Sequence, residues 1–89
     1  MLENPIVVYK SITVANRAKK LAEKEGIKAS IIQLPSTFNI KGCTYAVSVR
    51  ENKLHEMLNL SKKYKLRVRA YFPDGTAESG VYIKEEKTK

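Results

Sequence analysis

Residues 28–49, KASIIQLPSTFNIKGCTYAVSV, decide the fold of this chain because they hold two predicted strands in direct succession. Residues 28–34 are rich in β-branched and apolar side chains and end at Pro35, which is typical of a strand. Residues 43–49 predict a second strand, whose odd-numbered side chains are the more apolar set. Residues 36–42 form the loop between them.

A strand and a helix are predicted before this centre. The β-branched run IVVYK at residues 6–10 predicts the strand. A hydroxyl side chain can then cap a helix by accepting hydrogen bonds from its free N–H groups, and a glycine beyond its end supplies a left-handed stop. The helix is bounded by Ser11 or Thr13 at its start, and by Lys24 or Glu25 and then Gly26 at its end.

A second helix and strand are predicted after the centre. Glu51 or Asn52 opens this helix, which ends near Lys65. Its apolar positions recur at spacings of three and four residues: Leu54, Met57, Leu58, and Ser61 or Tyr64. Residues 66–72, LRVRAYF, alternate, which predicts a strand with Val68, Ala70 and Phe72 on a buried face and Arg67, Arg69 and Tyr71 on an outer face.

The C-terminal residues read as a hairpin and a tail. Residues 73–75, Pro-Asp-Gly, predict a turn, and residues 80–83 can return as a short fifth strand. The charged residues 84–89 are expected to fray.

The whole order predicts one α+β domain over residues 1–89, with its core in residues 6–72. Strand, helix, strand, strand, helix, strand is the split βαβ pattern of the ferredoxin-like sandwich, in which two helices cover one face of an antiparallel sheet. With right-handed crossovers, the end of the first strand lies beside the starts of the third and fourth. The residues expected at that end of the sheet are Lys10, Ser11, residues 35–42, Cys43, residues 62–65 and Arg67.

Composition limits the possible functions. The formal net charge of +8, from 17 Lys and Arg against 9 acids, favours anionic partners without naming one. A single Cys forms no internal disulfide, and no apolar stretch approaches the roughly 20 residues of a membrane span, so we expect a cytoplasmic protein that does not enter a membrane. No metal site or cofactor is predicted, and whether the protein is an enzyme stays undecided.

Cys43 is the residue on which a chemical function would depend. At the start of its strand, near a helix N-terminus and lysines, its thiolate would be favoured, and Gly42 would allow a close backbone approach. The alternative is a small buried hydrophobe, as free cysteines often are. His55, the only histidine, lies off the apolar stripe of its helix, so a Cys–His pair is not expected.

The chain resembles the small bacterial family of selenium/sulfur carrier-like proteins over about residues 6–72. The matching elements are Tyr9 and Ser11, Ala15 and Ala18, Glu25-Gly26-Ile27, Pro35 and Cys43. The family pattern has Gly directly after its Cys, whereas here Gly42 precedes the Cys and Thr44 follows it.

The resemblance implies a thiol that accepts a sulfur or selenium atom from a donor protein and passes it to an acceptor protein. Cys43 is then the covalent site. Its expected supporting residues are Ser11, Thr13, Lys41, Gly42 and Arg67.

Two other functions stay open on the sequence. Arg67, Arg69 and Tyr71 on an open sheet face could bind single-stranded nucleic acid through stacking and phosphate contacts. The same face, or the strand after Pro73, could form a homodimer. In both cases Cys43 would be structural.

Overall fold

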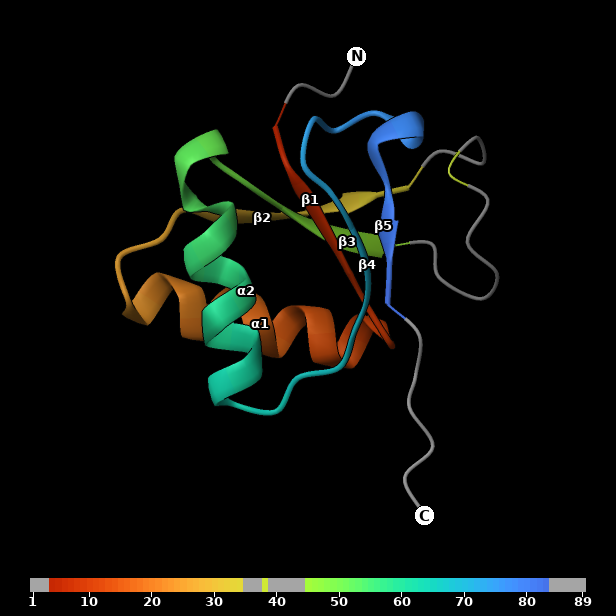
Figure 1. Ribbon diagram of the computed structural model, residues 1–89. Helices are drawn as coiled ribbons and strands as arrows, with labels where there is room; N and C mark the ends of the chain where they lie inside the picture. The colour runs from red at the N-terminus through yellow and green to blue at the C-terminus, as the bar shows by residue number, and fades with distance from the viewer. Residues whose placement is uncertain (1–3, 35–37, 39–44, 84–89) are drawn as a thin grey trace.

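The computed structural model describes residues 4–34, 38 and 45–83 of the chain. Within them, helices α1 (Ile12–Lys24) and α2 (Leu54–Lys63) pack on one face of a five-stranded antiparallel sheet (Figure 1). The strand order β2-β3-β1-β4-β5 confirms the predicted ferredoxin-like fold, including the fifth strand. The strands are β1 (Ile6–Tyr9), β2 (Ala29–Gln33), β3 (Tyr45–Val49), β4 (Val68–Phe72) and β5 (Val81–Tyr82), and the 3-10 helices are η2 (Glu51–Lys53) and η3 (Ala77–Ser79).

Helix α1 begins and ends as the sequence predicts. Ser11, rather than Thr13, is the cap, and its Oγ accepts a hydrogen bond from the Val14 N–H at 3.2 Å. At the other end, Gly26 has a φ of 82°, and the Ile27 N–H donates to the Ala22 carbonyl at 2.8 Å. This left-handed residue with a 6→1 bond satisfies the last carbonyls of the helix and turns the chain into β2.

Helix α2 ends in the same way without a glycine. Lys65 has a φ of 59°, and the Leu66 N–H donates to the Ser61 carbonyl at 2.8 Å. A side chain disfavours this left-handed conformation, so the turn is held by its hydrogen bonds and by β4, which follows it.

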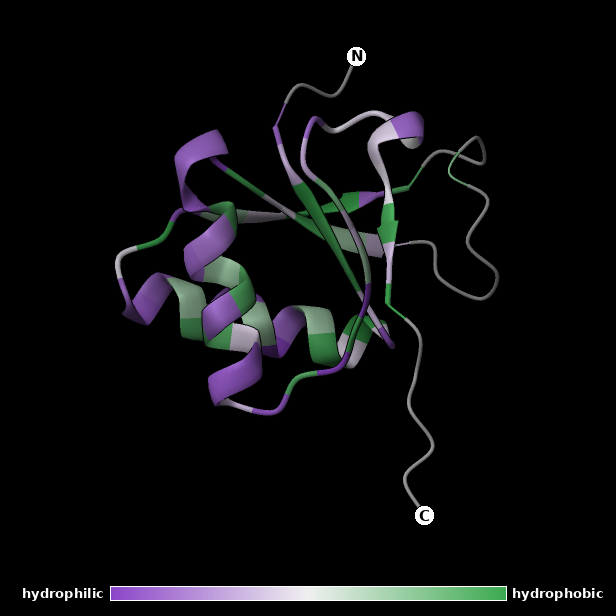
Figure 2. Ribbon diagram, viewed as in Figure 1, coloured by the Kyte–Doolittle hydropathy of each residue, from purple (hydrophilic) through white to green (hydrophobic). Residues whose placement is uncertain are grey.

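The helices and one face of the sheet enclose the main core. The odd-numbered residues of β1 and β3, Val7, Tyr9, Val47 and Val49, point to the helices, as predicted for the third strand. They meet small and apolar helix residues, namely Ala15, Ala18, Ala22, Met57 and Leu60. Figure 2 shows hydrophobic segments on the strands and hydrophobic segments alternating with hydrophilic ones along both helices.

The opposite face of the sheet is covered by a second core, contrary to the predicted open face. Ile6 and Val8 of β1 meet Ala46, Ala70 and Phe72 there, and all five are 0% exposed. Leu34 and Phe38, which come after β2, complete this second core. The β-branched residues of β1 are therefore buried on both faces of the sheet.

The predicted burial of Ala70 and Phe72 in β4 is confirmed, but the predicted sides of Val68 and Tyr71 are wrong. Ala70 and Phe72 belong to the second core, while Tyr71 packs against the helix-side core and does not join an outer surface with Arg67 and Arg69. Val68 also lies on the helix side, because the pairing register shifts between Val8 and Tyr9 of β1. This irregularity interrupts the period of two on which the prediction depended.

Candidate functional site at the basic end of the sheet

The C-terminal end of β1 and the start of β4 lie together, as predicted. Tyr9 pairs with Val68, and the Lys10 N–H donates to the Arg67 carbonyl at 3.2 Å. Strand β3 is antiparallel to β1, so its first residue, Tyr45, belongs to this same end of the sheet. We call Lys10, Ser11, Arg67 and the turn at residues 62–65 the basic end, and all of these residues are exposed.

The N-terminus of α1 belongs to the basic end. Ser11 and Thr13 are both exposed there, but the Ser11 Oγ is engaged in capping the Val14 N–H. No acidic side chain lies in the first turn of α1. The positive end of the helix dipole and the cation of Lys10 therefore act together at this end, and both favour a negatively charged group.

Three of the predicted site residues, Lys41, Gly42 and Cys43, lie outside the described residues. Two anchors flank them in the sequence. Phe38, five residues before Cys43, is buried in the second core, and Tyr45, two residues after it, begins β3. Of the other predicted residues, Ser11, Thr13 and Arg67, the structure brings Ser11 and Arg67 next to Lys10.

A buried pair of hydrogen-bonded side chains, Tyr9 and Ser61, lies directly next to the basic end in the chain. The sequence analysis did not predict this pair. The Tyr9 hydroxyl lies 2.6 Å from the Ser61 Oγ, which itself donates to the Met57 carbonyl at 2.9 Å. Because the single Ser61 proton is used there, Tyr9 is the donor of the shorter bond. Burial raises the pKa of Tyr9 to about 12, partly offset by the hydrogen bond with Ser61. Tyr9 is thus a neutral donor that ties β1 to α2.

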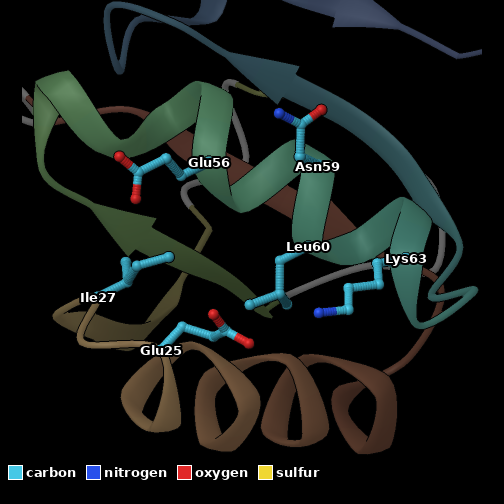
Figure 3. A pocket seen from close by; sticks show the side chains of 6 residues that line it. All are labelled: Glu25, Ile27, Glu56, Asn59, Leu60 and Lys63. Atoms are coloured by element: carbon cyan, nitrogen blue, oxygen red, sulfur yellow. The ribbon is translucent and has the colours of Figure 1, made fainter.

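A shallow hollow of about 250 Å³ lies between the two helices (Figure 3). Ile27 and Leu60 supply its apolar surface, and Glu25, Glu56, Asn59 and Lys63 supply polar groups. In Figure 3 the Glu25 and Lys63 side chains extend toward each other from opposite sides. None of Ser11, Thr13 and Arg67 lines this hollow, so it is separate from the predicted site.

Two further observations concern metals and membranes. Among the residues that the structure describes, no three His, Cys, Asp or Glu side chains are grouped closely enough to hold a metal ion. His55 is exposed on α2. No helix in the described part of the chain has the length and apolar character needed to cross a membrane.

The fold and the basic end define a small ferredoxin-like domain with one candidate reactive residue. Residues 4–73 match the family described as "Putative Se/S carrier protein-like", and the chain belongs to that family. The match contains the βαββαβ core and Cys43, and it ends before β5. No curated protein and no solved structure is significantly similar to this chain.

Proposed function

We propose that the protein carries a sulfur or selenium atom on the Cys43 thiol between a donor and an acceptor protein. The observation that carries this proposal is family membership over residues 4–73, a region that includes the only cysteine of the chain. A carrier needs one nucleophilic atom and no second thiol, which agrees with this composition.

The transfer balances without an external oxidant. The Cys43 thiolate attacks the terminal sulfur of a donor persulfide; a bond forms between Sγ and that sulfur, the donor S–S bond breaks, and the donor leaves as a thiolate. An acceptor nucleophile then attacks the same terminal atom, and Cys43 leaves as a thiolate. A selenium atom follows the same route, with an S–Se bond in place of the S–S bond.

The basic end supports this chemistry electrostatically. Cys43 comes two residues before β3, which starts at the end of the sheet where α1 begins and where Lys10 meets Arg67. Cations and a helix N-terminus lower the pKa of a thiol and raise its thiolate fraction near neutral pH. Lys41, Ser11, Thr13 and Arg67 are proposed to favour the thiolate and the transferred anion, and Gly42 to let the partner approach.

The nucleic-acid alternative loses its aromatic contact. Tyr71, which was expected to stack a base beside Arg67 and Arg69, packs against the helix-side core. Only the two arginines remain of that predicted surface. Binding to nucleic acid and homodimerisation stay predictions from the sequence.

The thiolate character of Cys43 can be measured by its alkylation rate. With one cysteine in the chain, every alkylation by iodoacetamide occurs at Cys43. Near pH 7 we expect the folded protein to react about 3-fold or more faster than the same chain in urea, because a lowered pKa enlarges the thiolate fraction more than it weakens the nucleophile.

Salt provides the control for this experiment. The advantage of the folded chain should shrink as ionic strength rises, because exposed charges are screened. A folded protein that reacts no faster than the unfolded chain at low salt would contradict the proposed thiolate.

A further inference from the structure

The hairpin after Phe72 lies outside the family match, which ends at residue 73. Its turn is closed by the Gly75 N–H, which donates to the Phe72 carbonyl at 3.0 Å. Strand β5 then pairs with β4 through Ala70 with Tyr82 and Tyr71 with Val81. This hairpin is therefore an addition to the βαββαβ core, and the contacts of its side chains with that core suggest its role.

The hairpin carries an aromatic side chain to the second core. The rings of Phe72 and Tyr82 meet edge to face, with centroids 5.8 Å apart. Gly80 permits this approach, because a methyl group at its Cα would lie 2.5 Å from Cε2 of the Phe72 ring. Phe72 is fully buried, so it has little room to move away from such a methyl group.

The same aromatic group holds Phe38. The Phe38 and Phe72 rings pack edge to face with centroids 4.7 Å apart, and the Tyr82 hydroxyl donates to the Phe38 main-chain carbonyl at 3.5 Å. Phe38 is 5% exposed and precedes Cys43 by five residues. A ring contact alone would only cover apolar surface, whereas this long bond also reaches the main chain at Phe38.

We propose that Tyr82 is a positioning residue for the Cys43 thiol. It acts through Phe72 and Phe38, holding Phe38, five residues before Cys43, against the face of the sheet opposite the helices. This inference rests on the proposed function, since the position of the thiol matters only if the thiol reacts. On this proposal, the hairpin controls how accessible Cys43 is to its donor and acceptor proteins.

The test is the limiting rate of alkylation by iodoacetamide at a pH where the thiol is fully ionised, which reports access independently of the pKa. In Tyr82→Ala, Phe72 loses one edge-to-face neighbour and the Phe38 carbonyl loses its hydrogen bond, so we expect the limiting rate to rise about 2- to 10-fold. Tyr82→Phe keeps the ring but loses the hydrogen bond to Phe38, so its limiting rate should lie between those of the wild type and Tyr82→Ala. Val81→Ala, on the same strand but outside the aromatic group, should leave the rate unchanged.

Measuring the global unfolding of each variant in urea distinguishes a positioning role of Tyr82 from an effect on overall stability. If Tyr82→Ala is folded and its limiting rate does not rise, the positioning role is wrong; a rise shared equally by Val81→Ala is also against it. Should Tyr82→Ala fail to fold, Tyr82→Leu, which keeps apolar area without the ring or hydroxyl, is held to the same criterion. Loading of the wild type by a persulfide donor is measured separately, so a failed carrier function is distinguishable from a failed positioning role.

Discussion

Phe72→Ala is expected to lower the free energy of unfolding by about 3–5 kcal/mol, the usual cost of truncating a buried aromatic side chain. Phe72 is 0% exposed and contacts both Phe38 and Tyr82 edge to face. Removing its ring opens a cavity between the sheet and the segments that cover the second core. Urea unfolding followed by circular dichroism measures the loss, which is a large part of the roughly 5–15 kcal/mol that stabilises a small domain.

Tyr64→Ala is the matched control for this truncation. Tyr64 is 40% exposed at the end of α2, with the Lys63 ammonium 5.4 Å from its ring centroid. An exposed cation–π contact of this kind contributes at most about 1 kcal/mol, so the control should lose far less stability than Phe72→Ala. Equal losses in the two variants would show that the second core does not stabilise the sheet.

Alkaline pH is expected to destabilise the wild type more than Tyr9→Phe. Burial raises the pKa of Tyr9 from 10.0 to about 12 in the folded chain. The stability that comes from this raised pKa is fully present below the unfolded value and is lost as pH rises through the folded value. Between about pH 9 and about pH 11 the wild type should therefore lose about 1 kcal/mol that Tyr9→Phe does not lose.

The comparison between the two proteins isolates Tyr9, because every other side chain is the same in both. Near neutral pH, Tyr9→Phe should be about 1 kcal/mol less stable than the wild type, since the Ser61 hydroxyl loses the proton it accepts. The two stabilities should then converge as pH rises. Parallel losses in both proteins across this range would mean that Tyr9 is not the buried donor described above.

Much of the fold could be predicted from the sequence because local signals and long-range packing agree. Ser11 is a hydroxyl placed directly before a helical pattern, and Gly26 stands where a left-handed residue is needed. Two consecutive strands at residues 28–49, with a strand and a helix before them and a helix and a strand after them, then predict the strand order of the ferredoxin-like fold. The observed β2 and β3 pair in register from Ala29 with Val49 to Gln33 with Tyr45.

The second core could not be predicted by the same reasoning. Strand alternation assigns the faces of β4 only if the pairing is regular, and the register shift beside Tyr9 places Val68 on the same, helix-facing side as Tyr71. Phe38 and Tyr82, which both contact Phe72 of the second core, lie outside the longer strands and helices, where the sequence has no periodic pattern. The sequence does contain one indication of the second core. In the run IVVY of β1, polar residues do not alternate with apolar ones, as expected for a strand that is buried on both faces of the sheet.

The candidate site was only partly predictable. Antiparallel pairing brings Lys10 beside Arg67, and this follows from strand order alone. The Tyr9–Ser61 bond was missed because it joins residues 52 positions apart. A serine at an apolar position of α2 and a tyrosine in a buried strand are each polar groups that need a partner, and that requirement could have suggested the pair.

The intact mass of the protein after exposure to a persulfide donor tests the carrier function most directly. We predict one added sulfur atom on the wild type, its loss on treatment with a thiol acceptor, and no addition to Cys43→Ser. The same measurement with a selenium donor should give one added selenium atom. A folded wild type that keeps an unmodified Cys43 under these conditions would contradict the carrier function and leave Cys43 as a structural residue.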